Sequence, residues 1–192
     1  NMEIQIGKDS MQWGQGKRGS LLLTNNATPR KAISLSNIEP IQTGGIFKFL
    51  GEVNARGFYS ELEDDRGDVD QPSYTGVRLD FVPSDRFTFG IARADMVGGK
   101  GHSLNGSDYW DWLFGKNAHS NDKWNAIAGL DFRWRLNTLR GAQVYGELYG
   151  EDQAGKLPPL PRDNAYLLGI YLPRVSASGD WDAHLEWSET SP

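Results

Sequence analysis

Alternation of apolar and polar residues from Trp124 to Leu136 limits the possible folds of this chain more than any other feature. The even positions are apolar, and apart from Ile127 the odd positions are polar or glycine. A repeat of two residues is the period of a β-strand, because successive side chains point to opposite faces. At about 3.3 Å per residue this strand would extend about 43 Å, far beyond the usual length of about 5–6 residues. A strand of this length, tilted by about 45°, would cross a lipid bilayer.

The same alternation recurs along most of the chain, and no helical period persists for more than a turn or two. It is found in six more segments: Phe47–Arg56, Val77–Phe81, Phe87–Ala92, Ala142–Glu151, Ala165–Leu172 and Trp181–Trp187. We therefore predict an all-β fold with seven meander strands between residues 46 and 188. Residues 1–45 are predicted to form irregular strands and loops, with strand-like stretches at Glu3–Gly7, Leu21–Thr24 and Ile33–Ile38.

The connections between these strands alternate in length. The long ones are 57–73, 97–123 and 152–163, and the short or turn-like ones are 83–86, 137–141 and 174–180. An up-and-down outer-membrane barrel has this property, with brief periplasmic turns and extended external loops. We predict that residues 1–192 form a single segment of an antiparallel, up-and-down transmembrane β-barrel, with its long loops extracellular.

A soluble antiparallel sheet would show the same alternation with its inside and outside exchanged. Strand length, and Trp and Tyr residues near strand ends as in membrane-interface belts, favour the barrel. Mixed charges on the polar face suit a hydrated lumen, although a solvated surface can carry them too. The predicted lumen residues are Arg78, Asp80, Asp131, Arg133, Arg135, Glu147, Glu151, Asp182, His184 and Glu186.

Composition argues against several other functions. The formal net charge is −5, which gives no support to a nucleic-acid partner. The chain has no cysteine and 3 histidines without ligand spacing, so we expect no disulfide, no metal site and no cofactor. No signal peptide opens the sequence, so the protein is either cytoplasmic or a mature or excised segment, and the barrel pattern favours the second.

The run from Trp13 to Ala27, followed by Pro29, reads WGQGKRGSLLLTNNA. It resembles the signature segment of the Wzi capsule-assembly family, which typically reads Trp-Gly-Pro-Gly, then Gly-Ser-Leu-x-Leu-Ser-Asn-Asn and a Pro. Gln15 replaces the usual Pro, a departure that we expect to loosen the turn. Weaker similarities lie at Leu130-Asp131, at Val144–Glu147 with Glu151-Asp152, and at Leu185–Trp187, so that together they span nearly the whole chain.

This resemblance implies an outer-membrane β-barrel of Gram-negative bacteria, acting as a lectin that binds and anchors capsular or surface polysaccharide. It also implies a larger barrel of about eighteen strands, of which this chain would be a part. The implied partners are the polysaccharide and outer-membrane lipid, and we expect a monomeric barrel.

Aromatic and amide side chains mark the candidate carbohydrate contacts. Tyr109, Trp110 and Trp112 lie in one long connection, beside aspartates that can accept hydrogen bonds from sugar hydroxyls. Aromatic faces stack on the C–H faces of sugars, which offer little wholly apolar area. The alternative is that these rings pack the loop over the barrel mouth, in one short helical turn. Trp13, Asn25 and Asn26 of the signature segment are further candidates.

Two other functions remain open at this level. A charged lumen alone would also suit a passive, porin-like channel. Glu147, Glu151, Glu186 and Asp131 could be read as paired glycosidase carboxylates. A barrel lumen carries such groups in any case, and no pattern separates an acid from a nucleophile, so we predict no catalysis.

Overall fold

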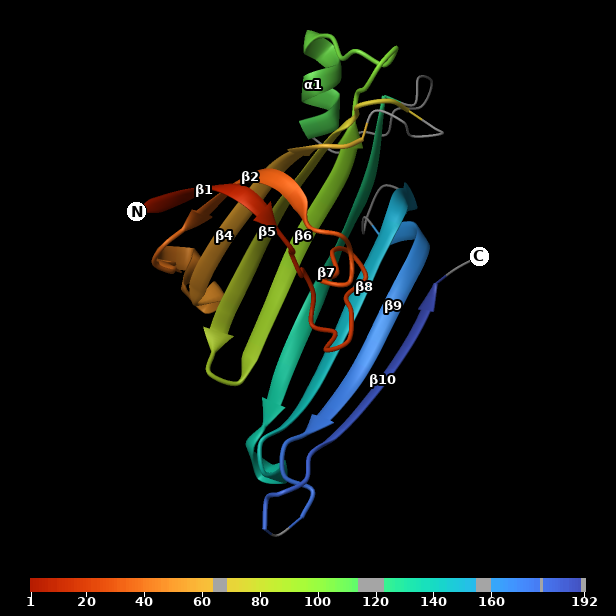
Figure 1. The fold of residues 1–192 in the computed structure, drawn as a ribbon. Helices are drawn as coiled ribbons and strands as arrows, with labels where there is room; N and C mark the ends of the chain where they lie inside the picture. Colours follow the sequence, from red (N-terminus) through yellow and green to blue (C-terminus); the bar gives the residue numbers. More distant parts are fainter. Residues whose placement is uncertain (64–68, 114–122, 155–159, 177, 191–192) are drawn as a thin grey trace.

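A computed structural model describes residues 1–63, 69–113, 123–154, 160–176 and 178–190. These residues form one curved antiparallel sheet of ten strands (Figure 1). The strands are β1 (Met2–Asp9), β2 (Arg30–Asn37), β3 (Ile41–Gln42), β4 (Glu52–Glu61), β5 (Ser73–Ser84), β6 (Phe87–Val97), β7 (Trp124–Leu136), β8 (Ala142–Ala154), β9 (Leu160–Leu172) and β10 (Ala183–Thr190). Successive strands are neighbours from β4 to β10, with β2 and then β1 beside β4, so the predicted up-and-down antiparallel fold is confirmed.

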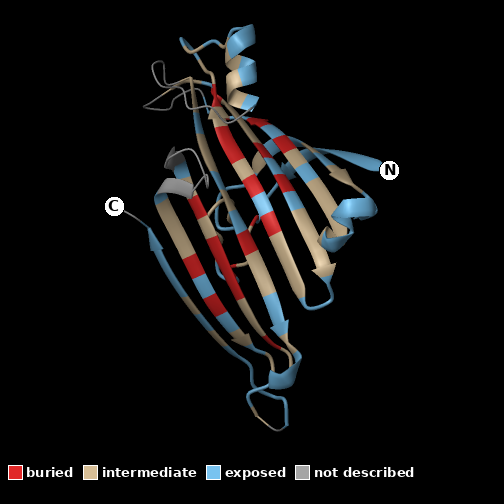
Figure 2. Cartoon of the chain, turned by 180° about the vertical axis from the view of Figure 1, so that it is seen from behind, coloured by how far each residue is buried: buried red, intermediate tan, exposed pale blue. Residues whose placement is uncertain are grey.

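The apolar face of the sheet points outward. Leu130 and Trp134 on β7 are 47% and 53% exposed, whereas Asp131 between them is 0% exposed. Buried and exposed residues alternate along the central strands in Figure 2. A soluble sheet buries its apolar face, so this arrangement is the reverse, as an outer-membrane barrel requires. We call the side of the sheet that carries Asp131 the concave face.

Among the described residues, no helix is both long enough and apolar enough to cross a membrane.

A long segment between β1 and β2, residues 10–29, folds across the concave face, and we call it the inner loop (Figure 1). Its Trp13 is 3% exposed and packs with Phe58, Ala92 and Tyr149 from three strands. Three consecutive leucines of the loop, 21–23, pack against this cluster together with Ile127. Ile127 is the one apolar residue on the polar side of β7, and packing against this cluster shields it from water.

Glycine lies directly opposite an aromatic residue at three places on the concave face. The cross-strand pairs are Phe58 with Gly76, Tyr149 with Gly129, and Tyr145 with Gly169. In each pair a Cβ on the glycine would overlap the aromatic ring. The glycines therefore let the rings lie flat across the neighbouring strand, an arrangement that helps pin strand register.

The connections after β5, β7 and β9 lie at the lower end of the sheet in Figure 1, and those after β4 and β6 lie at the upper end. The predicted sorting by length holds only in part, because the connection after β9, residues 173–182, is long although it lies at the lower end. The upper end also carries the single α-helix of the described residues, α1 (Gly106–Leu113). The connection predicted over 152–163 is much shorter than expected, because β8 and β9 stay paired as far as Ala154 and Leu160.

Three predicted strands differ in the structure. The stretch around Phe47 and Phe49 forms a 3-10 helix, Gly45–Leu50, because Gly45 and Gly51 adopt positive φ angles of 58° and 69° and break the alternation. Residues 21–24 form only an isolated bridge, between Trp13 and Leu23. Trp181 precedes β10 and is 72% exposed, because the turn after β9 extends past it.

Candidate functional site

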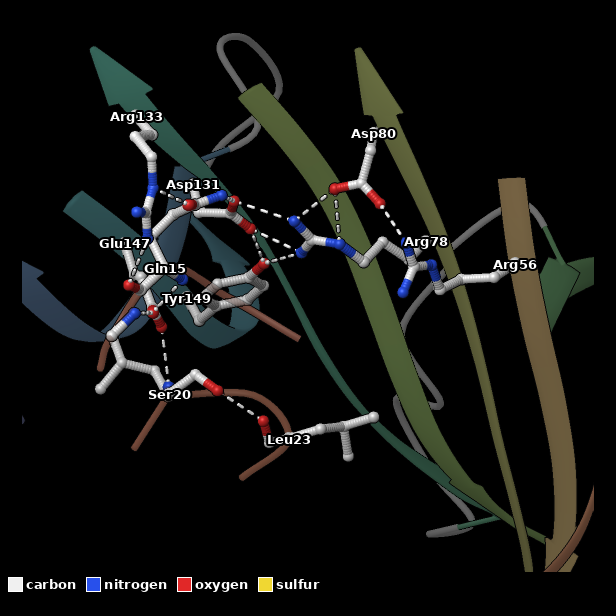
Figure 3. Close-up of polar contacts among 12 residues, drawn as sticks. Gln15, Ser20, Leu23, Arg56, Arg78, Asp80, Asp131, Arg133, Glu147 and Tyr149 are labelled. Atoms are coloured by element: carbon white, nitrogen blue, oxygen red, sulfur yellow. Dashed lines mark hydrogen bonds and ion pairs between the residues drawn. The ribbon is translucent and has the colours of Figure 1, made fainter. Parts of the chain in front are cut away.

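Glu147 on β8 holds the inner loop to the concave face (Figure 3). Its Oε1 accepts hydrogen bonds from the backbone N–H groups of Gln15 and Gly16, both at 2.6 Å. Its Oε2 accepts a third, from the N–H of Leu21 at 2.8 Å. Glu147 is only 3% exposed, so its carboxylate provides the hydrogen-bond acceptor that these three amides would otherwise find in water.

Gly14 is needed for this close approach of the loop to Glu147. Its φ is +142°, and a Cβ on it would lie 2.5 Å from the Glu147 Oε1 and 2.6 Å from the Cβ of Ser20. The glycine of the signature segment therefore provides both a backbone conformation and the space that the carboxylate occupies.

Gln15, the departure from the family pattern, fastens the loop through hydrogen bonds. Its side-chain amide donates to Asp131 Oδ1 at 2.6 Å, and its Oε1 accepts from Arg133 Nε at 2.8 Å. Its backbone carbonyl accepts from the other end of the Arg133 guanidinium at 3.1 Å. Proline has no N–H, so the usual residue could not make the Gln15–Glu147 hydrogen bond. These hydrogen bonds oppose the loosening expected from the loss of the proline ring, and the balance of the two effects stays a prediction.

A row of charged side chains crosses the concave face from β4 to β7 (Figure 3). Arg78 donates to both oxygens of Asp131, at 2.6 and 2.9 Å, and pairs with Asp80 at 2.6 Å. Asp131 also accepts from the Tyr149 hydroxyl at 2.7 Å. Arg56 lies 3.3 Å from Asp80 and is much more exposed than Arg78. Charges this deeply buried are tolerated because each is paired and hydrogen-bonded.

A second polar group lies near β10. The Tyr145 hydroxyl contacts His184 Nε2 and donates to Glu186 Oε1 at 2.8 Å. Glu186 also accepts from the backbone N–H of Lys17 at 2.7 Å, so β10 too is tied to the inner loop.

Seven of the ten predicted lumen residues take part in the contacts with the inner loop, in the charged row or in the polar group near β10. They are Arg78, Asp80, Asp131, Arg133, Glu147, His184 and Glu186. Arg135, Glu151 and Asp182 are exposed instead. Asp182 makes only a 3.8 Å ion pair with Lys17, with both side chains more than half exposed, which contributes little to stability.

Four residues in these contacts were not among the predicted site residues: Gln15, Arg56, Tyr145 and Tyr149. The two tyrosines each lie two residues from Glu147 along β8 and therefore point to the same face. The alternation of the sequence could have identified them. Nothing local to the signature segment indicates that Gln15 reaches β7.

The helix α1 is held at the upper end of the sheet by its capping residues. Asn105 Oδ1 accepts from the N–H groups of Ser107 and Asp108 at 3.0 Å, and Asp108 Oδ2 accepts from the Asn105 N–H at 2.8 Å. These hydrogen bonds form a reciprocal capping box. Lys123 Nζ also donates to the Asp108 carboxylate, at 2.6 Å. The hydrogen bond from the Asn105 backbone, and then that from Lys123, lower the pKa of Asp108.

The predicted sugar-contacting residues are in different environments. On α1, Tyr109 and Trp110 are 55% and 63% exposed, while Trp112 is partly buried, with the Arg93 guanidinium 6.0 Å from its ring. Trp13 of the inner loop is buried against the strands of the sheet. In the same loop Asn25 is exposed, and Asn26 is exposed but donates to the Arg18 carbonyl at 2.8 Å.

Comparison with known proteins agrees with the fold and the loop. The family model of capsule assembly protein Wzi matches residues 1–192. The chain is 27% identical over 176 residues to a 55.8 kDa protein of the cps region of Klebsiella pneumoniae, covering 88% of this chain and 34% of that protein.

The structure is also similar to that of Wzi from Escherichia coli, described as an outer-membrane protein involved in group 1 capsule assembly and a carbohydrate-binding β-barrel. The TM-score is 0.73 at 26% identity, covering 89% of this chain and 36% of that one. The chain thus spans about a third of the length of both relatives. The outward apolar face, the inner loop built from the signature segment and the match over the whole chain place this protein in the Wzi capsule-assembly family.

Proposed function

We propose that the complete protein containing this chain is an outer-membrane lectin that binds and anchors capsular or surface polysaccharide without chemical change. The observation that carries the proposal is the orientation of the sheet: Leu130 and Trp134 are exposed on its outer face and Asp131 is buried on its concave face. The protein with this orientation belongs to the Wzi family. Lipid would cover the bare face of a monomeric barrel. The upper end, with α1 and the connection after β6, would then be extracellular.

Tyr109 and Trp110 on α1 are the proposed aromatic contacts with the polymer. Both rings are more than half exposed, although the helix itself is fixed by its cap and by Lys123. A ring on a fixed support loses little conformational freedom when a sugar stacks on it. Trp112 is assigned a supporting role beside Arg93, and Trp13 is left out because its ring is enclosed by Phe58 and its neighbours.

Polysaccharide retention tests this proposal directly. The complete protein, purified in detergent and immobilised, should retain capsular polysaccharide from the same strain, and Tyr109→Ala with Trp110→Ala should lower retention at least fivefold. Trp181→Ala is the matched control, because this ring is 72% exposed and follows β9 at the opposite end of the sheet. Failure of the unaltered protein to retain any surface polysaccharide would remove the proposed function.

The channel and enzyme alternatives receive less support. The inner loop and the buried ion pairs occupy the concave face that a wide pore would leave to water. The carboxylates of Asp131, Glu147 and Glu186 are engaged by hydrogen bonds from the protein itself. Planar-bilayer conductance close to the baseline, and no sugar released from polymer during long incubation, are the expected results.

A further inference from the structure

An open cavity of about 410 Å³ lies on the concave face, at the Arg56 end of the charged row. It is lined by β1, β2, β4 and the first residues of the inner loop, Asp9 to Trp13. Its volume falls within the range of about 300–1,000 Å³ typical of small-molecule sites. Because Gln5 and Asp9 at its edge are exposed, the cavity is reached from solvent.

Hydroxyl, amide and guanidinium groups dominate the cavity wall. Gln5 on β1 lies directly opposite Ser34 on β2, and Ser36 on β2 lies directly opposite Arg56 on β4, so four polar side chains share one face. Within the described part of the chain, the side chains of Gln5, Ser34 and Ser36 make no hydrogen bond. Partly buried hydroxyls without protein partners are available to a ligand or to water.

Apolar and small residues complete the wall. Trp13 and Met11 border the cavity from the inner loop, and the absence of side chains at Gly7 and Gly57 widens it. Arg56 is 48% exposed and held only loosely, 3.3 Å from Asp80, so its donors can turn toward a bound molecule. Hydroxyl-binding groups beside a limited apolar surface match the surface of a pyranose, which has polar edges and C–H faces.

We propose that this cavity binds one or two sugar units and is a second saccharide site, separate from the aromatic pair on α1. The inference rests on the proposed function, because it assumes that the ligand is a carbohydrate. Ser34 and Ser36 would donate and accept hydrogen bonds with the hydroxyls of the sugar ring. Gln5 would contact the sugar at the edge of the cavity, and Arg56 would donate to an acceptor oxygen of the sugar. A polymer held on α1 could then have a terminal or side-chain sugar bound beside the inner loop.

Filling the cavity tests the proposal without touching α1. The probes are glucose, galactose, mannose and glucuronic acid, measured by saturation-transfer NMR and titration on the complete protein in detergent. Ser34→Phe should weaken binding of the sugars that the unaltered protein binds by at least tenfold. Ile33→Phe is the matched control, because Ile33 is the preceding residue on the opposite, outer face and is 49% exposed; it should change binding less than twofold.

A second variant protects the test against misfolding. Gln5→Ala combined with Ser36→Ala removes two hydrogen-bonding groups without adding bulk, and it should weaken the same sugars about three- to tenfold. Trp181→Ala, at an exposed ring that lines neither site, should leave the binding of these single sugars unchanged.

The two proposals fail in different ways. Binding of no probe by the unaltered protein, or unchanged binding by both cavity variants, overturns the cavity site even when polymer is retained. Loss of polymer retention by the unaltered protein overturns the proposed function itself.

Discussion

Arg78 on β5 and Asp131 on β7 form a bidentate ion pair across β6, directly above Gly90. The guanidinium reaches both carboxylate oxygens, at 2.6 and 2.9 Å, although β6 separates the two strands. A Cβ on Gly90 would lie 2.8 Å from the Arg78 Cζ and 3.0 Å from Asp131 Oδ1. The missing side chain of Gly90 therefore leaves room for these two charges to meet across β6.

Gly90→Ala should disrupt this pair and destabilise the protein. Breaking a buried pair costs about 3–5 kcal/mol when a charge is left unpaired, and we expect about 2 kcal/mol here because Arg78 keeps Asp80 and Asp131 keeps Tyr149. The denaturant midpoint of the complete protein, followed by heat-modifiable gel migration, measures the effect. Gly7→Ala on β1 is the control, because nothing lies within 4 Å of its added Cβ. Equal midpoints for the two variants would contradict the assigned role of Gly90.

Glu147→Ala should release the inner loop while leaving the sheet intact. Three backbone amides lose a charged acceptor, and hydrogen bonds to charged groups each contribute about 1.5–3 kcal/mol. We expect the Gln15, Gly16 and Leu21 amides to exchange with deuterium at least a hundredfold faster, with little change within β8 and β9. Glu3→Ala on the exposed β1 should leave all three amides protected. Retained protection in Glu147→Ala would mean that the other contacts of the loop, through Trp13, Gln15 and Lys17, are enough to hold it.

Gln15→Pro, which restores the residue usual in the family, should weaken the attachment of the inner loop in this protein. Proline removes the N–H that donates to Glu147 and the side chain that joins Asp131 to Arg133. We expect a loss of about 1–3 kcal/mol in the free energy of unfolding. Gln15→Ala keeps the N–H and should lose less. A proline variant as stable as the original chain would show that ring rigidity compensates for the lost hydrogen bonds.

The helix α1 should keep its cap down to mildly acidic pH. Because the pKa of Asp108 is lowered from 3.8 in the folded protein, its contribution is fully present above that value and is lost as pH falls through the lower, folded-state pKa. Exchange of the Tyr109 amide, corrected for intrinsic rates, should therefore be equally protected at pH 7 and pH 5. Asp108→Asn should reduce protection at both values, and Ser103→Ala should not. Loss of protection in the original chain between pH 7 and pH 5 would contradict this assignment.

Strand direction, strand order and the orientation of the sheet were predictable because they depend on local alternation. Leu130 and Trp134 could be assigned to the outer face from period and strand length alone, and both are bare in the structure. The same reasoning failed near Phe47, where glycines with positive φ interrupt the strand, and over 152–163, where pairing between β8 and β9 continues into a stretch without clear alternation.

The candidate site was less predictable, since its contacts join residues far apart in the chain. Alternation along the strands placed Arg78, Asp131 and Glu147 on the polar face. It could not show that Glu147 accepts hydrogen bonds from the amides of a loop more than a hundred residues away. Nor could it show that Gln5, Ser34 and Arg56 enclose one cavity.

By itself, the sequence determined which face of each strand is apolar, because that face depends only on side chains alternating along a single chain. Only the tertiary structure decided what covers the polar face. The inner loop lies there for two reasons. Its backbone amides donate hydrogen bonds to the buried Glu147 carboxylate, which would otherwise be unsatisfied. Its Trp13 joins the apolar cluster against which Ile127 packs, so both side chains are shielded from water.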